Sequence, residues 1–426
     1  MSRIAIVGTG YVGLTTGACF AHLGHDVICA DVDVDKIARL SAGEIPIVEH
    51  GLDRLVDEGL RSGRLSFVVG AANAVKDCDI AFLCVPTPQG EDGSADLSYI
   101  ESAAREIAPH LPYESVVVNK STVPVGSARV VERVLDRPDV KVVSNPEFLR
   151  EGSAVQDFLK PDRIVVGSTD QAAAIKVSSL YLGVAAPVLV TDPASAETIK
   201  YAANAFLATK LSFVNAVAAI CEGVGADVND VVLGLGYDKR IGQDFLRPGP
   251  GWGGSCFPKD TRALLKIADD AGYSFDLLEG VVTVNDEQFD RVTQKVVDAV
   301  GGDVSGRHVA VWGLTFKART DDLRESPSVA IIERLLALGA TVKGHDPTVM
   351  GPKPGVPAGV VVCTDPYEAT DGADVLVVLT EWDDYRWLDP GKVTVGMVGR
   401  SVVDARNLLD RSEWRRAGFQ YSGIGR

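Results

Sequence analysis

The stretch Arg3-Ile-Ala-Ile-Val-Gly-Thr-Gly-Tyr-Val-Gly13 decides the fold of the first part of this chain. Its apolar start predicts a buried strand, and the pattern after the glycines predicts a helix that runs to about Leu23. Gly8-x-Gly10-x-x-Gly13 is a dinucleotide-binding fingerprint when it stands between a strand and a helix, as it does here. A second strand over His25–Ala30 completes a βαβ unit.

The glycines and the acidic residue that follows them predict the cofactor. Glycines allow the tight turn, the close approach of a pyrophosphate and the packing of helix against strand, and the first N–H groups of the helix receive the phosphates. Asp31 ends the second strand, where a carboxylate can accept hydrogen bonds from a ribose diol and would repel a 2′-phosphate. The sequence therefore favours NAD over NADP. The alternatives are a Rossmann fold that binds another nucleotide or none, and an Asp31 that is only a turn residue.

Short apolar runs farther along the chain predict buried parallel strands with helices between most of them. These runs are Ile80–Val85, Ser115–Asn119, Lys141–Ser144, Arg163–Val166 and Pro187–Val190. Strands that alternate with helices imply an α/β fold with a doubly wound sheet. We expect residues 1–192 to form a Rossmann-like domain that binds NAD.

The middle of the chain predicts helices. After the start signal Thr191-Asp-Pro193, helical spacing of apolar residues continues to about Val224. The apolar window contains Asn204, Lys210 and Glu222, which favours a buried helix over a membrane span. Such a long helix could join two α/β domains and contribute a dimer contact. We expect residues 193–300 to form a central helical region.

From Gly306 onward the alternation of strands and helices returns. Strands are predicted at Arg307–Trp312, Thr341–Gly344, Asp374–Leu379 and Ser401–Asp404, a helix at Pro327–Leu338 and a loop at Val349–Val361. Asp346 follows the second of these strands as Asp31 ends the second strand of the chain. Residues 301–426 are therefore expected to form a second Rossmann-like domain, related to the first by loose internal repetition.

Length and composition indicate a soluble protein of two or three domains. The 426 residues are 46% hydrophobic and 23% charged, and a net charge of -16 argues against nucleic acid as a partner. Seven scattered cysteines without a Cys-x-x-Cys pair argue against disulfides or a metal site and for a reducing compartment. The chain begins directly with a strand, so we expect no signal peptide, no membrane partner and a cytoplasmic location.

The glycine-rich stretch Gly249-Pro-Gly-Trp-Gly-Gly-Ser-Cys256-Phe-Pro-Lys-Asp260 predicts the reactive group. Glycines let a backbone come close to a ligand, and Pro258 with the run Thr261–Ala268 predicts a short helix. Cys256 would then precede a helix N-terminus, which favours a thiolate, and Lys259 would add to this effect. A nicotinamide site together with an activated thiol suggests an oxidation past the aldehyde through a thioester. The alternative is a buried, inert cysteine.

Several ordered motifs identify a resemblance to a known family. They are the first glycine motif, Lys120–Gly126, Ser144–Gly152, Lys200–Asn204, the stretch around Cys256 and Phe316–Arg324. The chain resembles the UDP-glucose/GDP-mannose dehydrogenase family over nearly its whole length. This resemblance implies an NAD domain and a UDP domain joined by a long helix through which a homodimer forms. It also implies a four-electron oxidation of a sugar C6 alcohol to a carboxylate with two NAD. The expected substrate is UDP-glucose, and the alternatives are a UDP-N-acetylhexosamine and GDP-mannose.

The resemblance assigns roles to the reacting groups. Cys256 is the nucleophile, and Lys200 and Asn204, one helical turn apart, stabilise the oxyanion. Asp260 takes part in the proton transfers with a water and the lysine, and Glu147 with Thr122 supports thioester hydrolysis. Periodicity alone would make Lys200 the partner of Glu197 in an exposed salt bridge. The alternative for Asp260 is an aspartate in the first turn of a helix. The alternative for Glu147 is a solvated carboxylate, and for Thr122 it is a helix cap.

The resemblance also assigns the binding residues. Those expected to bind the cofactor are Gly8, Gly10, Tyr11, Val12, Gly13, Asp31, Lys36, Val85, Thr87, Ser121, Thr122, Glu151 and Arg324. Those expected to bind the UDP-sugar are Glu147, Phe148, Leu149, Glu151, Lys200, Asn204, Arg240, Phe245, Arg247, Gly251, Phe257, Lys317 and Arg406. Arg240 is expected to reach the neighbouring subunit. Taken singly, each arginine or lysine is more often a surface charge, and the two phenylalanines are as consistent with the core.

Two further classes of function remain open. A non-catalytic nucleotide-sugar or NAD-binding protein would bind without turnover, and a two-electron dehydrogenase would stop at an aldehyde or ketone. The complete set of Cys256, Lys200, Asn204 and Asp260 argues against the first class. A two-electron dehydrogenase needs no thiol and forms one NADH for each sugar, whereas the four-electron reaction forms two. The NADH count therefore distinguishes this second class.

Overall fold

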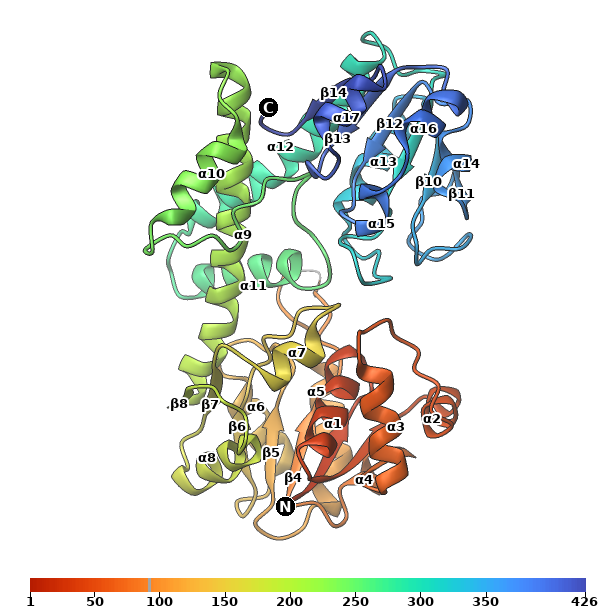
Figure 1. Ribbon diagram of the computed structural model, residues 1–426. Helices are drawn as coiled ribbons and strands as arrows, with labels where there is room; N and C mark the ends of the chain where they lie inside the picture. The colour runs from red at the N-terminus through yellow and green to blue at the C-terminus, as the bar shows by residue number, and fades with distance from the viewer. Residues whose placement is uncertain (91–92) are drawn as a thin grey trace. The chain divides into compact units, whose positions relative to one another are not determined.

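A computed structural model describes residues 1–90 and 93–426. The chain divides into two compact units. The first contains Met1–Ala203 and Arg262–Tyr273, and the second contains Asn204–Thr261 and Ser274–Arg426. Each unit holds one sheet, and the two sheets confirm the expected α/β class with two Rossmann-like folds (Figure 1).

The first sheet has eight strands in the order β3-β2-β1-β4-β5-β6-β7-β8. Neighbouring strands are parallel except for β6 and β7. The strands are β1 Arg3–Val7, β2 Asp26–Asp31, β3 Leu65–Val69, β4 Ile80–Leu83, β5 Val116–Asn119, β6 Lys141–Ser144, β7 Ile164–Gly167 and β8 Val188–Thr191. Side chains of one strand point alternately to the two faces, so Ile4 and Ile6 join one apolar cluster while Ala5 and Val7 join another.

Helices cover both faces of this sheet, as a buried parallel sheet requires. Leu14 of α1 and Leu55 of α3 pack on the face of Ile4, whereas Ile100 of α5 and Val131 of α6 pack on the opposite face. The helices are α1 Tyr11–His22, α2 Val34–Ser41, α3 Leu52–Ser62, α4 Ala71–Ala74, α5 Ser98–Ile107, η1 Ala108–His110, α6 Ser127–Leu135, α7 Ala154–Leu159, α8 Gln171–Ser178 and η2 Ser179–Tyr181.

Two expectations for this sheet were wrong. The strand at Ile164–Gly167 runs antiparallel to its neighbour β6, and β8 is exposed rather than buried. Val188, Leu189 and Val190 are 42%, 49% and 54% exposed because β8 lies at the edge of the sheet and pairs with β7 alone. The strand β3 was missed.

The long helix of the middle region is confirmed as α9, Pro193–Val224. By length and hydropathy it would suffice to cross a membrane, but core helices of globular proteins meet the same criterion, and 44% of its most apolar window is buried. The expected burial of this helix is only partial, since Phe206, Phe213 and Ile220 are 65%, 56% and 62% exposed. The other helices of the middle region are α10 Val228–Tyr237, α11 Phe257–Asp270 and α12 Asp276–Ala299.

The second sheet repeats the first. Its six parallel strands lie in the order β11-β10-β9-β12-β13-β14, the same order as the first six strands of the larger sheet. The strands are β9 His308–Trp312, β10 Thr341–His345, β11 Val360–Cys363, β12 Val375–Val378, β13 Ser401–Asp404 and β14 Gln420–Gly423. The helices are α13 Pro327–Ala337, α14 Pro366–Thr370, α15 Asp383–Arg386, α16 Pro390–Gly396 and α17 Arg411–Arg416.

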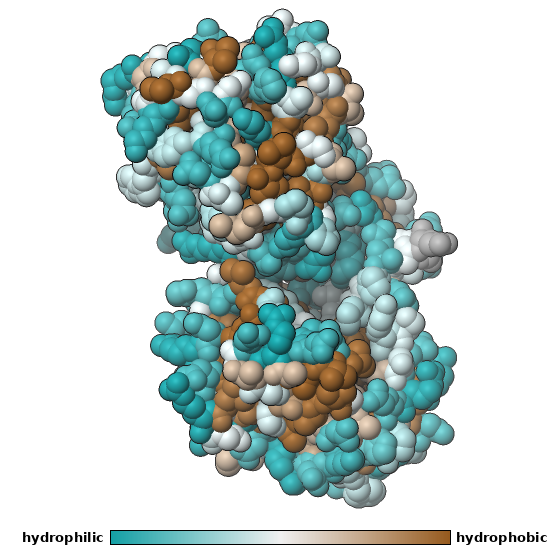
Figure 2. All heavy atoms as spheres, turned by 90° about the vertical axis from the view of Figure 1, so that its right-hand side faces the viewer, coloured by the Kyte–Doolittle hydropathy of each residue, from teal (hydrophilic) through white to brown (hydrophobic). Residues whose placement is uncertain are grey.

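The expected internal repetition is thus confirmed at the level of topology. The strands β11 and β14 were missed, and β11 begins inside the expected loop Val349–Val361. Both missed strands are short, with four residues each. Figure 2 shows one face of the protein, on which several brown hydrophobic groups interrupt the teal hydrophilic surface.

Candidate active site

The first glycine turn leaves room for a ligand at one position. Gly8 has a φ of +98°, and a Cβ there would lie 2.7 Å from the Cys84 carbonyl oxygen. A Cβ on Gly13 would lie 1.9 Å from the Gly8 carbonyl oxygen. These two glycines are therefore required by the packing of the chain itself. Gly10 differs, because no described atom lies within 4 Å of a Cβ built on it. Gly10 precedes α1, and no side chain caps this helix N-terminus, so its N–H groups suit a pyrophosphate.

Asp31 lies at the carboxyl end of β2 beside this turn. Its Oδ2 accepts hydrogen bonds from Thr9 N at 2.9 Å, from Thr9 Oγ1 at 2.6 Å and from Lys36 Nζ at 2.8 Å. Burial alone would raise the pKa of Asp31, but these donors outweigh it and lower the pKa to about 2. The carboxylate stays ionised at neutral pH, and Lys36, another expected cofactor residue, is held against it.

Tyr11 and Val12, in the first turn of α1, are half-buried. The Tyr11 hydroxyl donates a hydrogen bond to Glu49, a buried residue that the sequence reasoning missed. Gly152 N donates to the Tyr11 hydroxyl at 2.8 Å and to Glu49 Oε2 at 2.7 Å. The glycine turn is thereby linked to the segment after β6. Glu151, expected near the cofactor, is the neighbour of Gly152 and is half-buried.

The ends of β4 and β5 bring three more expected cofactor residues together. The Ser121 hydroxyl donates to the Val85 carbonyl oxygen at 2.6 Å. Val85 and Thr87 lie in the loop after β4 and are half-buried. In a parallel sheet the ligand lies at the carboxyl ends of the strands, so these loops lie at the expected edge.

Lys200 and Glu147 form a buried ion pair in the first unit. Lys200 Nζ donates to Glu147 Oε1 at 2.8 Å, and the two side chains are 4% and 6% exposed. Burial would raise the pKa of Glu147, but the charge and the hydrogen bond of Lys200 lower it below its usual value. The alternative of an exposed Lys200–Glu197 salt bridge was wrong, and Glu147 is not a solvated carboxylate.

The segment after Glu147 surrounds this pair. Leu149 N donates to Glu147 Oε2 at 2.6 Å, and two cations lie close to the Phe148 ring. The Arg163 guanidinium is 3.7 Å and the Lys200 ammonium 5.4 Å from the Phe148 ring centroid. Phe148 and Leu149 are half-buried, so they line a partly open surface beside the ion pair.

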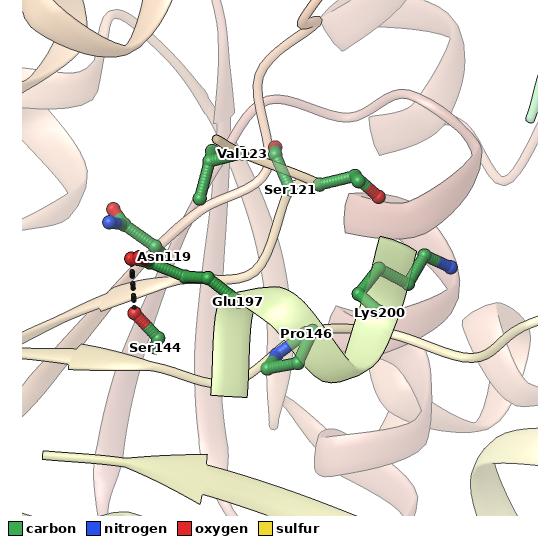
Figure 3. A pocket seen from close by; sticks show the side chains of 8 residues that line it. Asn119, Ser121, Val123, Ser144, Pro146, Glu197 and Lys200 are labelled. Atoms are coloured by element: carbon green, nitrogen blue, oxygen red, sulfur yellow. Dashed lines mark hydrogen bonds between the residues drawn. The ribbon is translucent and has the colours of Figure 1, made fainter. Parts of the chain in front are cut away.

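A small pocket lies next to the ion pair in the first unit. It is lined by Asn119, Ser121, Thr122, Val123, Ser144, Pro146, Glu197 and Lys200 (Figure 3). Thr122 stands in the loop between β5 and α6, and α6 is capped by Gly126, so the helix-cap alternative for Thr122 was wrong. The Asn119 amide is buried, and neither its nitrogen nor its oxygen has a hydrogen-bond partner among the described residues.

Two further buried charges near the pair were missed by the sequence reasoning. Glu197 is 3% exposed and accepts hydrogen bonds from Gly126 N, Ala128 N and Ser144 Oγ. Lys120 is 4% exposed and donates to Asn145 Oδ1 at 3.1 Å and to the Tyr181 hydroxyl at 3.2 Å. The available signal was their position, since Glu197 stands one helical turn before Lys200 and Lys120 directly follows a buried strand.

Cys256 occupies the start of α11 in the second unit, as expected. Its carbonyl oxygen accepts the first helical hydrogen bond, from Asp260 N at 2.9 Å, and its side chain is partly exposed. The other six cysteines are buried. Ser255 Oγ lies 3.7 Å from the sulfur. Cys256 directly precedes the N-terminus of α11, a position at which the helix dipole favours a thiolate.

Asp260 connects this helix to α9. Asn204 Nδ2 donates to Asp260 Oδ2 at 2.6 Å, and Lys259 Nζ donates to Asp260 Oδ1 at 2.6 Å. Asp260 is fully buried, so the two donors satisfy a carboxylate that water does not reach. Helix α9 carries Lys200 and Asn204 one turn apart, as predicted.

The glycines before Cys256 serve a different purpose from the one inferred. A Cβ on Gly251, at φ +123°, would lie 2.4 Å from the Phe289 ring. A Cβ on Gly253 would lie 1.9 Å from the Glu325 carbonyl oxygen, and one on Gly254 2.7 Å from the Phe316 ring. Packing within the second unit therefore requires these glycines, and they are not evidence for a ligand or against an inert thiol.

The cations of the second unit, expected to bind the substrate or, for Arg324, the cofactor, fall into two groups. Arg406 Nε donates to the Leu379 carbonyl oxygen at 2.8 Å and lies 3.0 Å from Glu381 Oε2, and its Nη2 donates to the Phe316 carbonyl oxygen. Lys317, next to Phe316, is half-buried. The second group is exposed and consists of Arg240, Arg247 and Arg324.

Within that exposed group, two arginines are paired with nearby aspartates. Arg240 bonds Asp238 at 2.6 Å, and Arg324 bonds Asp322 at 2.7 Å. The half-buried rings of Phe245 and Phe257 lie 6.3 Å apart. Both rings are therefore available for further contacts on their open sides.

Comparison with known proteins identifies the family. Profiles of the UDP-glucose/GDP-mannose dehydrogenase family match residues 2–184 with its NAD binding domain, 194–287 with its central domain and 310–411 with its UDP binding domain. The chain belongs to this family. The expected resemblance is confirmed, and the glycine turn with Asp31 lies in the part that matches the NAD binding domain.

Members of this family are similar to the chain over its full length. UDP-glucose 6-dehydrogenase of Rhizobium meliloti is 48% identical over 100% of this chain and 99% of its own length. That of Pseudomonas aeruginosa is 44% identical over 100% and 97%. A solved UDP-glucose dehydrogenase from Pyrobaculum islandicum superposes with a TM-score of 0.91 at 40% identity, covering 100% of this chain and 98% of that one.

Proposed function

We propose that this protein is an NAD-dependent dehydrogenase that oxidises C6 of UDP-glucose to the carboxylate of UDP-glucuronate. Full-length likeness to UDP-glucose 6-dehydrogenases supports the substrate, since a UDP-D-ManNAc dehydrogenase of Pyrococcus horikoshii is only 27% identical and a GDP-mannose dehydrogenase of Pseudomonas aeruginosa 31%. The observation that carries the chemistry is Cys256 at the start of α11, followed one turn later by buried Asp260.

The residues of the first unit fit NAD. Gly10 and the uncapped start of α1 would receive the pyrophosphate, and Asp31 would accept hydrogen bonds from the ribose diol. Asp31 Oδ1 accepts one bond, from Asp33 N, so acceptor capacity remains for a ligand. The nicotinamide supplies a hydride acceptor, and two such molecules are needed for the four electrons.

Cys256 is proposed to hold the half-oxidised sugar. Its thiolate adds to the C6 aldehyde, forming a carbon–sulfur bond and a thiohemiacetal oxyanion that takes up a proton. Loss of a second hydride and of the hydroxyl proton gives a thioester. Water then breaks the carbon–sulfur bond, which releases the carboxylate, one proton and the free thiol. The helix start stabilises the thiolate as nucleophile and as leaving group.

The polar groups of α9 and of the Glu147 segment are proposed to control protons and charge. The Lys200 ammonium and the Asn204 amide are donors that suit an oxyanion. Glu147 is ionised and held by Lys200, so it can accept a proton from the hydrolytic water, and Thr122 orients that water. Asp260, held by Asn204 and Lys259, is proposed to assist the first proton transfer.

UDP binding is proposed for the second unit, which matches the UDP binding domain of the family. Arg406 and Lys317 supply positive charge for the diphosphate, and Arg247 and Arg240 add to it, Arg240 from the partner subunit. The pair of phenylalanines described above would contact the uridine or the sugar.

We propose that the subunits form a homodimer through α9 in the cytoplasm. Phe206, Phe213 and Ile220 recur every seven residues, so they lie on one face of the helix. Leu233 and Tyr237 of α10 add exposed apolar surface at 48% and 71% exposure. Large exposed apolar side chains on one helix face are consistent with an interface.

NADH stoichiometry tests the proposal. Purified protein incubated with limiting UDP-glucose and excess NAD should form two NADH for each sugar, with UDP-N-acetylhexosamine and GDP-mannose as the competing substrates. Absence of NADH from UDP-glucose, or greater turnover of a competitor, would refute the substrate assignment. One NADH for each sugar would refute the four-electron reaction.

The variant Cys256→Ser tests the covalent step. It should lose carboxylate formation by at least about a thousandfold, because an unactivated hydroxyl is a poor nucleophile, while the affinity for NAD stays unchanged. Cys363→Ser, at a buried cysteine of the second unit, is the matched control and should remain active. Carboxylate production by Cys256→Ser at the normal rate would rule out the thioester.

A further inference from the structure

Glu197 connects three segments of the first unit through one buried carboxylate. Its Oε2 accepts a hydrogen bond from Gly126 N at 2.6 Å. Its Oε1 accepts from Ala128 N at 3.0 Å and from Ser144 Oγ at 2.9 Å. The residue is 3% exposed, so these bonds replace the water that a carboxylate would otherwise bind.

The position of this carboxylate compensates for a helix that cannot cap itself. Helix α6 begins at Ser127, and its N-cap is Gly126, with a φ of +96° and no side chain. The first N–H groups of a helix need acceptors, and an anion is favoured at that end. Glu197 supplies the acceptor from α9, a different element. Burial raises the pKa of Glu197 above its usual value, which agrees with a carboxylate held in a dry site.

The three connected segments are those that carry the proposed chemistry. The loop before Gly126 holds Thr122, and Ser144 ends the strand that leads to Glu147. Glu197 itself stands one turn before Lys200 on α9. Figure 3 shows the Glu197–Ser144 hydrogen bond at the pocket that Thr122 and Lys200 also line.

We propose that Glu197 is a positioning residue that fixes the Thr122 loop relative to the Lys200–Glu147 pair. The inference rests on the proposed function, because it assigns Glu197 to the hydrolysis of the thioester through Thr122. Glu197 does not touch the reacting atoms in this role. It sets where the loop places the hydroxyl that orients the water.

The variant Glu197→Gln tests the role while keeping the shape of the side chain. Its amide group must present N–H toward one of the donors, so at least one of the bonds to Gly126 or Ala128 is lost. Because a displacement of about 1 Å can reduce a rate by roughly a hundredfold, we expect kcat to fall about 10- to 100-fold. KM for NAD and for UDP-glucose should stay within about threefold. Glu132→Gln, at an exposed position of α6, is the matched control.

A double-mutant cycle separates positioning from a general structural effect. If Glu197 acts through Thr122, Glu197→Gln should reduce kcat little further in a Thr122→Ala background. Multiplicative losses in the double variant would overturn the proposal, as would an unchanged kcat in Glu197→Gln. Ser144→Ala, which removes one of the three bonds, is the milder second variant and should give a smaller loss of the same kind.

Amide hydrogen exchange measures the hydrogen bonds that Glu197 accepts, without any substrate. In Glu197→Gln at least one of the Gly126 and Ala128 amides should exchange at least about tenfold faster, whereas Glu132→Gln should leave both unchanged. Unchanged exchange would overturn the proposal even if the enzyme is active. If Glu197→Gln shows faster exchange but the wild-type protein does not oxidise UDP-glucose, the proposed function is wrong and the structural role of Glu197 stands.

Discussion

Lys200 and Glu147 are ionised groups that the fold removes from water, and such a pair tolerates the loss of both charges better than the loss of one. Lys200→Ala leaves the Glu147 carboxylate buried without its cation. We expect the free energy of unfolding to fall by about 3–5 kcal/mol, measured by urea denaturation at pH 7. The double variant Lys200→Met with Glu147→Gln should recover most of this loss.

Lys141→Ala, at an exposed position of the same unit, is the control for the loss of a lysine. A Lys200→Ala variant as stable as this control would contradict the buried ion pair. The comparison also separates stability from catalysis, because the double variant should be stable and inactive.

Lys120 is a buried cation whose burial lowers its pKa from 10.5 to about 8. Between these values the unfolded chain binds the proton more tightly than the folded one, so the free energy of unfolding should rise with pH from about 8 to about 10. Lys120→Met should remove this rise and gain about 3 kcal/mol at pH 7. Urea denaturation at several pH values measures both effects.

The exposed Lys76→Met variant is the reference for that series. A Lys120→Met protein with the same pH dependence as the wild type would show that this ammonium does not titrate in the expected window. Loss of stability at pH 7 would show that its bonds to Asn145 and Tyr181 outweigh the cost of burial.

At the scale of elements, periodicity and glycine patterns predicted the long strands and helices, including both ends of α9. They missed β3, β11 and β14, which are partly exposed, whereas predicted strands of similar length, such as β4, are buried along their whole length. They also misread β8, since sequence does not show which strand lies at a sheet edge.

The residues of the candidate site also differ in whether the sequence could predict them. Cys256 and Lys200 could be found because each stands at a position set by a local motif. The roles of Glu49 and Glu197 could not be predicted, because they depend on partners about a hundred or about seventy residues away in the chain, which only folding brings close. The purpose of the glycines before Cys256 was misread for the same reason, as their neighbours Phe289 and Glu325 are distant in sequence.

Helix α9 supplies a prediction at this scale. Phe213→Lys places a charge in the middle of its exposed apolar face and should convert the proposed dimer to a monomer, measured by sedimentation velocity at micromolar protein concentration. Tyr273→Lys changes an aromatic residue that is also exposed, at 64%, but lies outside α9, and should leave the dimer intact. A Phe213→Lys variant that remains dimeric would place the interface elsewhere.

At the scale of the whole molecule, the two Rossmann-like folds use the same carboxylate position in different ways. Asp31 is the last residue of β2 and Asp346 directly follows β10, and both accept hydrogen bonds from the turn that follows β1 or β9. Asp346 is fully buried, and its Oδ2 accepts bonds from Leu314 N, Thr315 N, Thr315 Oγ1 and Trp382 Nε1. The first fold thus keeps its carboxylate partly open, as the proposed contact with a ribose requires, and the second uses it to hold the segments after β9 and β12.

Matched substitutions at these two positions should therefore mainly change different properties, the free energy of unfolding for Asp346 and the KM for NAD for Asp31. Asp346→Asn leaves buried donors without an acceptor and should lower the free energy of unfolding by about 1–3 kcal/mol, with KM for NAD unchanged. Asp31→Asn weakens a charge-assisted contact to the ribose and should raise KM for NAD roughly tenfold.

The pH dependence of the same pair completes the test. The folded pKa of Asp31, about 2, lies below the unfolded value of 3.8, so its contribution to stability is present above about pH 4 and is lost as the pH falls toward 2. The stability difference between wild type and Asp31→Asn should shrink over that window. If Asp346→Asn instead raised KM for NAD, or Asp31→Asn left it unchanged, the cofactor would not be bound by the first fold as proposed.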